Sequence, residues 1–102
     1  MIGTNISTQN ANTPAILTSA GTALSANNAR IAFSIQNLGT NPLFVLLGSG
    51  ASTSVFHVVL KGGTSNDDGT GGTYSMEAGA IYNGIVTVAG TSPRFVVTEV
   101  AP

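Results

Sequence analysis

The chain has 102 residues, of which 42% are hydrophobic and only 7% are charged, with a net charge of −1 and no cysteine. This length suits one small domain with one hydrophobic core, and the composition excludes wholesale disorder, structural disulfides and thiolate metal sites. Globular proteins average about 25% charged residues. Because this chain has far fewer and a net charge near zero, copies of it repel one another little. The composition therefore favours a protein that packs against other protein.

Residues 1–14 form a polar, uncharged stretch rich in Asn and Thr that ends at Pro14. Because this stretch lacks hydrophobic periodicity, we expect an N-terminal arm here and a single domain over residues 15–102. Two interpretations of the arm stay open. It is either a frayed terminus or a segment that becomes ordered against a neighbouring molecule.

The first half of the domain contains four candidate strands. Short apolar segments at 15–17 and 22–24 flank Gly21. From Arg30 to Asn37 apolar and other residues alternate, which predicts a strand with Phe33 and Ile35 buried and Arg30 exposed. Turn-forming residues at 37–42 then lead into the apolar run 43–47, so we expect residues 30–47 to form a hairpin with a loop of about five residues.

The second half begins with a strand predicted over residues 55–60, apolar on both faces except for His57. A strand of this kind is central in a sandwich or covered by a partner. Residues 61–72 are polar and glycine-rich and predict a long loop. Short strands are expected at 73–76 and 80–82, and stronger ones at 85–89 and 94–100.

These segments predict an all-β fold of seven or eight short strands, because turn signals recur about every eight to twelve residues. No segment has the helical period of about 3.6 residues. We therefore expect an antiparallel β-sandwich of jelly-roll type behind an extended N-terminal arm.

The chain lacks most of the side chains that catalysis and cofactor binding require. It has one histidine and four carboxylates, so no metal site and no cofactor are expected. One alternative is a calcium site at residues 66–69, although this segment lacks the spacing of an EF-hand loop. Another is an esterase that uses Ser49 and His57, but the flanking glycines of a nucleophile elbow are missing. We therefore predict that the protein is not an enzyme.

Nucleic-acid and membrane partners are also not expected. Three basic residues, Arg30, Lys61 and Arg94, are too few to bind a phosphate backbone. The longest apolar runs are much shorter than the roughly 20 residues that cross a bilayer, and the N-terminus has no pattern of a secretion signal. We expect synthesis in the cytoplasm of a host cell.

Several turn and strand segments together resemble small structural proteins encoded in the virion modules of tailed bacteriophages. The resemblance covers about residues 30–100 and is carried by the segments 37–45, 47–52, 56–60, 66–72 and 84–95. Within that group it implies a capsid decoration or cement protein. Such proteins are usually trimers on the outside of the capsid, where they clamp neighbouring capsomers.

The prediction from the sequence is therefore a non-enzymatic virion protein, located on the capsid surface, whose partners are the major capsid protein and further copies of itself in a homotrimer. The residues predicted to form its interfaces are Ile2, Ile6, Thr8, His57, Lys61, Asp67 and Asp68. The alternative is a head-fibre, neck or tail accessory protein that binds a glycan or receptor through Phe56, Tyr74 or Tyr82.

Overall fold

The computed structural model describes residues 8–10, 15–76 and 81–101, and over these residues it consists of strands and loops with no helix. The strands are β1 (Thr8–Asn10), β2 (Ala15–Ile16), β3 (Ala20–Leu24), β4 (Ala32–Asn37), β5 (Leu43–Leu47), β6 (Val58–Leu60), β7 (Thr73–Met76), β8 (Val86–Ala89) and β9 (Arg94–Ala101). The prediction of an all-β fold is confirmed. The nine strands exceed the seven or eight predicted, because a three-residue strand lies within the arm. Residues 81–82, within the short strand predicted over 80–82, are not strand.

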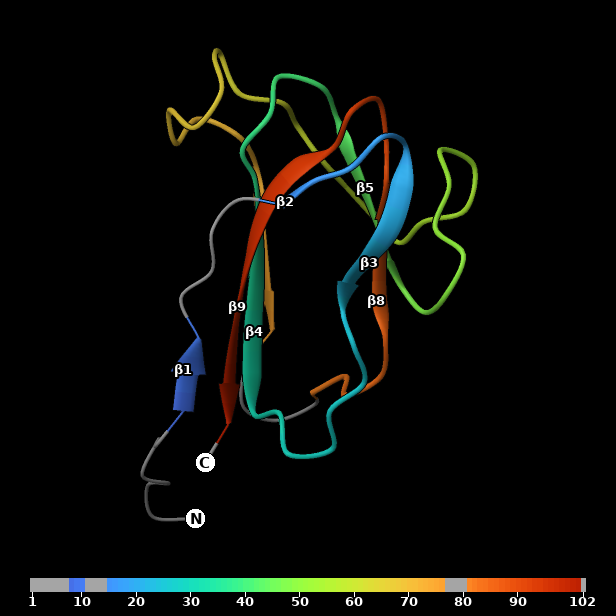
Figure 1. Ribbon diagram of the computed structural model, residues 1–102, viewed down its shortest axis with the longest axis vertical. Coiled ribbons are helices and arrows are strands. Elements are labelled where there is room, and N and C mark those ends of the chain that lie inside the picture. The colour runs from blue at the N-terminus through green and yellow to red at the C-terminus, as the bar shows by residue number, and fades with distance from the viewer. Residues whose placement is uncertain (1–7, 11–14, 77–80, 102) are drawn as a thin grey trace.

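The strands form two antiparallel sheets that face each other as in a β-sandwich (Figure 1). Sheet A has the order β1-β9-β4-β7, with β2 pairing along the same β9, and sheet B has the order β3-β8-β5-β6. In Figure 1, β4 and β9 of sheet A lie on the left, and β3 and β8 of sheet B lie on the right. Apart from the step from β5 to β6, each connection from β2 onward crosses from one sheet to the other.

One hydrophobic core lies between the sheets. In β4 and β9 the side chains alternate, so that Phe33, Ile35 and Phe95 point inward and are buried. Sheet B contributes Val45 and Val88, both fully buried. This alternation is the period of two that the sequence shows for residues 30–37.

β9 is the longest strand and organises sheet A. On one side it pairs with β4, from Ala32↔Val100 to Asn37↔Phe95. On the other side it pairs with β1 near its end (Thr8↔Ala101) and with β2 near its start (Ile16↔Arg94). Within the predicted arm, Thr8–Asn10 is thus an edge strand of the chain's own sheet. Ile2 and Ile6 lie outside the described residues.

The predicted hairpin over residues 30–47 is wrong. β4 pairs with β7 and β9 in sheet A, whereas β5 pairs with β6 and β8 in sheet B. The connection between β4 and β5 therefore crosses the sandwich instead of joining neighbours. The physical reason is that the apolar alternation requires each strand to bury one face but does not specify its neighbours, and here β4 and β5 bury their apolar faces against each other's sheet.

The strand predicted over residues 55–60 is shorter than expected. Only Val58–Leu60 is strand, because residues 52–55 form a tight turn. In this turn the Ser52 Oγ accepts hydrogen bonds from the amides of Ser54 and Val55. Such local bonds compete with the strand ladder.

Candidate functional site

Residues 48–57 form a loop over the outer face of sheet B, the green loop at the right of Figure 1. Thr87 fastens this loop: its hydroxyl donates to the Gly48 carbonyl over 2.6 Å and accepts from the Ala51 amide over 3.1 Å. Ala51 and Thr87 are consequently buried although they lie outside the core. The loop is therefore anchored to the sheet at its start.

The end of this loop presents an apolar surface, which we call the β6 patch: Phe44, Val55, Phe56 and Val59. Val55, Phe56 and Val59 are 52%, 39% and 44% exposed. The rings of Phe44 and Phe56 meet edge to face with centroids 5.0 Å apart, and Phe44 and Val59 are cross-strand partners. Exposed apolar groups that gather in this way are typical of protein–protein contact sites.

His57 holds the β6 patch in position. Its backbone amide donates to the Val45 carbonyl over 2.8 Å, and its Nδ1 accepts from the Leu47 amide over 3.1 Å. The imidazole is exposed beside Phe56. Its described hydrogen bond is therefore a structural one to the backbone of β5, not a contact with the Ser49 hydroxyl that an esterase would need.

The loop of residues 61–72 contains a second predicted group of site residues. Asp68 accepts hydrogen bonds from the amides and hydroxyls of Ser65 and Thr70, at 2.6–3.2 Å. These bonds, those from Thr70 most of all, lower the pKa of Asp68 from its ordinary 3.8 to about 2. The Asp68 carboxylate thus stabilises the turn formed by residues 65–70.

Asp67 lies beside this turn with a φ of 60°, in the left-handed region. Its carboxylate accepts two hydrogen bonds from Arg94, from Nε over 2.8 Å and from Nη2 over 2.5 Å. This fork lowers the pKa of Asp67 and raises that of Arg94. Both carboxylates of the alternative calcium site at residues 66–69 are therefore engaged by other groups, and in the described part of the chain no three His, Cys, Asp or Glu side chains gather to hold a metal.

Asn37, buried at the end of β4, ties the two loops at this end of the sandwich together. Its Nδ2 lies within hydrogen-bond distance of the carbonyls of Asn41, Leu60 and Lys61, at 2.8–3.1 Å, and its Oδ1 accepts from the Gly39 amide. A Cβ at Gly71 would collide with the Asn37 carbonyl, so glycine is required where the 61–72 loop returns.

Arg30 lies at the opposite end of the sandwich. The prediction that it is exposed is wrong, because its side chain is fully buried. Its Nε donates to Glu99 over 2.8 Å, and Nη2 donates to the Ser25 carbonyl over 2.7 Å. Its Nη1 donates to the carbonyls of Tyr82 and Gly84, at 2.9 and 3.1 Å. We call these four acceptors the Arg30 cage. A buried guanidinium persists only when its donors are satisfied in this way.

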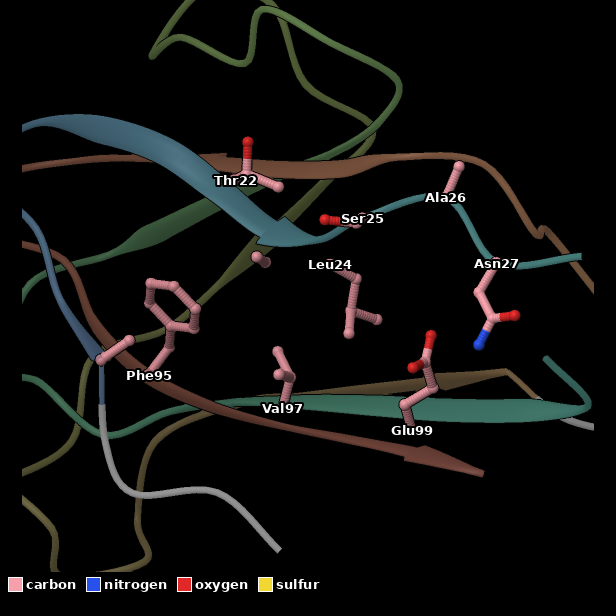
Figure 2. A pocket seen from close by; sticks show the side chains of 10 residues that line it. Thr22, Leu24, Ser25, Ala26, Asn27, Phe95, Val97 and Glu99 are labelled. Carbon is pink, nitrogen blue, oxygen red and sulfur yellow. The ribbon is translucent and has the colours of Figure 1, made fainter. Parts of the chain in front are cut away.

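A groove of about 540 Å³ runs between β3 and β9 beside the Arg30 cage. Figure 2 shows Leu24 and Val97 along it, with Asn27 and Glu99 facing each other at one end. The groove has both apolar and polar residues along it, with Asn27 and Glu99 at one end. One carboxylate oxygen of Glu99, Oε2, is occupied by Arg30.

The predicted interface residues fall into separate places. Lys61, Asp67 and Asp68 lie together in the 61–72 loop and are exposed, whereas His57 lies at the opposite end of β6. Thr8 pairs with Ala101 through the backbone. The alternation over residues 30–37 places Arg30 on the exposed face, so no local pattern marked Arg30 or Asn37 as a buried polar centre.

The described residues contain no helix long and apolar enough to span a bilayer. Searches against protein families, curated proteins and solved structures found no match to this chain. Its function therefore has to be inferred from its own residues.

Proposed function

We propose that the protein is a non-enzymatic structural component of a tailed-phage virion, a capsid cement or decoration protein that assembles as a homotrimer and binds the major capsid protein. The virion assignment is based on the sequence resemblance over residues 30–100. The assembly assignment is based on the surface of the domain.

The single observation that carries the assembly proposal is the β6 patch. Three large apolar side chains stand 39–52% exposed within a few residues of one another, and burying them against protein would gain roughly 25 cal/mol per Å². The charged groups do not oppose this contact. Arg30 pairs with Glu99 and Arg94 pairs with Asp67 within the same chain. None of these four residues belongs to the β6 patch, so a contact made by the patch does not have to break either pair.

The strand order supports a sandwich of jelly-roll type. Numbering β2 to β9 as strands one to eight, sheet A contains the order one-eight-three-six and sheet B the order two-seven-four-five. This is the interleaved arrangement of an eight-stranded jelly roll, a common architecture of viral capsid domains. β1 then adds an outer strand beside β9.

In this proposal the two groups of predicted contact residues have different partners. The β6 patch and His57 face a second copy. The loop with Lys61, Asp67 and Asp68, near the start of β9, contacts one part of the capsid. The arm residues Ile2, Ile6 and Thr8 contact another part, because Thr8 pairs at the other end of β9. Three copies joined in this way multiply a weak contact with the shell, and this avidity resists the outward pressure of packaged DNA without a tight single site.

The experiment is light scattering after size-exclusion chromatography on three proteins: wild type, Phe56→Ser/Val59→Thr, and the control Ile16→Thr. Ile16 is 64% exposed on β2, away from the patch. We expect a trimer of the 10.2 kDa chain for wild type and control, and a monomer for the patch variant. A wild-type monomer at high concentration contradicts the assembly proposal. If purified virions do not contain the protein, the virion assignment is wrong.

One observation favours the alternative, a glycan- or receptor-binding module on a fibre, neck or tail. Phe56 presents an exposed ring, and aromatic rings offer a flat apolar surface. Tyr74 and Tyr82 instead pack against the core, so the platform would consist of Phe56 alone among the three residues considered. Saturable sugar binding that is lost in Phe56→Ser, with an unchanged oligomeric state, would favour this alternative.

A further inference from the structure

The loop before β8 contains the dipeptide Asn83-Gly84, the only asparagine–glycine pair in the sequence. Asn83 is exposed. Within the described residues, neither its side-chain amide nor the Gly84 N–H makes a hydrogen bond, whereas the Asn83 carbonyl accepts from the Asn27 amide over 2.8 Å. The two groups that react in asparagine deamidation are therefore both unengaged by any described residue.

We propose that Asn83 is a site of spontaneous deamidation and that its isoaspartyl product opens the Arg30 cage. The Gly84 nitrogen attacks Cγ of Asn83, a C–N bond forms, and the side-chain amide leaves as ammonia, which gives a cyclic succinimide. Water then adds to either succinimide carbonyl. One ring opening gives aspartate with the original backbone, and the other gives isoaspartate. Glycine favours the first step because it has no Cβ to shield the nitrogen.

The consequence for the fold follows from the position of Arg30. Its Nη1 donates to the carbonyls of Tyr82 and Gly84, the residues on either side of Asn83. Isoaspartate routes the main chain through Cβ and adds one methylene between these two carbonyls. Both cannot then remain on one nitrogen without rearrangement, and a buried guanidinium that loses an acceptor is strongly destabilising. Aspartate leaves the spacing of the carbonyls unchanged.

Other asparagines differ from Asn83 in the following residue or in their environment. Asn37 is buried, with its side chain fully hydrogen-bonded, and precedes Leu38. Asn66 is exposed but precedes Asp67, whose side chain hinders the attacking nitrogen. We therefore expect modification to concentrate at Asn83, independently of whether the protein decorates a capsid.

The test is incubation of the folded protein at mildly alkaline pH, followed by peptide mass mapping and enzymatic methylation that labels isoaspartate. We expect Asn83 to convert to a mixture of aspartate and isoaspartate while Asn66 remains an amide. An Asn83→Gln variant should not convert, because glutamine would form a less favoured larger ring. If Asn83 stays an amide in folded protein while urea-unfolded protein converts, the proposed site is wrong.

The structural consequence has its own measurement. The isoaspartyl form, separated by ion exchange, should unfold at a clearly lower urea concentration than unmodified protein, whereas Asn83→Asp, the other product, should unfold at nearly the wild-type concentration. Equal midpoints for the isoaspartyl form and Asn83→Asp would overturn the link to Arg30. Because Asn83 is exposed, both substitutions are expected to fold.

Discussion

Two arginine–carboxylate pairs lie near opposite ends of β9, and they differ in what surrounds them. Arg30 and Glu99 have side chains that are 0% and 16% exposed, whereas Arg94 and Asp67 are 23% and 44% exposed. Arg30 also donates to three backbone carbonyls. The described bonds of the Arg94 side chain go to Asp67 alone. An arginine–carboxylate pair therefore holds three chain segments together at one end and lies on the surface at the other.

The end with the exposed pair is held together by a neutral group instead. Asn37 contacts three carbonyls and one amide, so it does at this end what Arg30 does at the other. We therefore expect the number of backbone groups that a side chain satisfies to determine how much it stabilises each end of this fold.

The largest expected effect comes from breaking the buried pair. Replacing Arg30 with Met leaves Glu99 without its partner and three carbonyls without their donor, which should lower the free energy of unfolding by about 3–5 kcal/mol. Urea unfolding followed by circular dichroism measures the loss. If Arg30→Met lost no more than a substitution of Arg94, the contrast between the two ends would be wrong.

A smaller loss, on the order of 3 kcal/mol, is expected for Asn37→Ala, because the buried Leu60 carbonyl loses a hydrogen-bond donor and the Gly39 amide loses its acceptor. Asn41→Ala is the matched control, since its exposed amide donates a single described bond to the Thr91 carbonyl over 3.0 Å. The control should change stability by about 0.5 kcal/mol or less. Similar losses for both variants would contradict the role given to Asn37.

The smallest effect is expected for the exposed pair, measured by a double-mutant cycle with Arg94→Gln and Asp67→Asn. Arg94 lowers the pKa of Asp67 below its ordinary 3.8, so the pair stabilises the fold above about pH 4 and this contribution is lost as the pH falls further. The coupling should also weaken in about 1 M salt, which screens exposed charges. A coupling that persisted in acid would show that the interaction is not ionic.

The sequence indicated the all-β class and several strand positions well, because both follow from the alternation of apolar with other residues along the chain. Phe33, Ile35, Phe95 and Val97 alternate with other residues, and a strand with one buried face requires that alternation. Leu43–Leu47 is a strand as predicted. The apolar character of Val55, Phe56 and Val59 was also visible, but not that residues 55–57 lie in a loop outside the strand.

The sequence by itself thus determined the all-β class and the positions of most strands. Only the tertiary structure decided which strands are neighbours, because β4 and β5 bury their apolar faces equally well in one sheet or in two. It also decided the fate of Arg30, since burial of a guanidinium depends on carbonyls from Ser25, Tyr82 and Gly84. No local sequence pattern predicts these hydrogen-bond partners, because folding brings them to Arg30 from other parts of the chain.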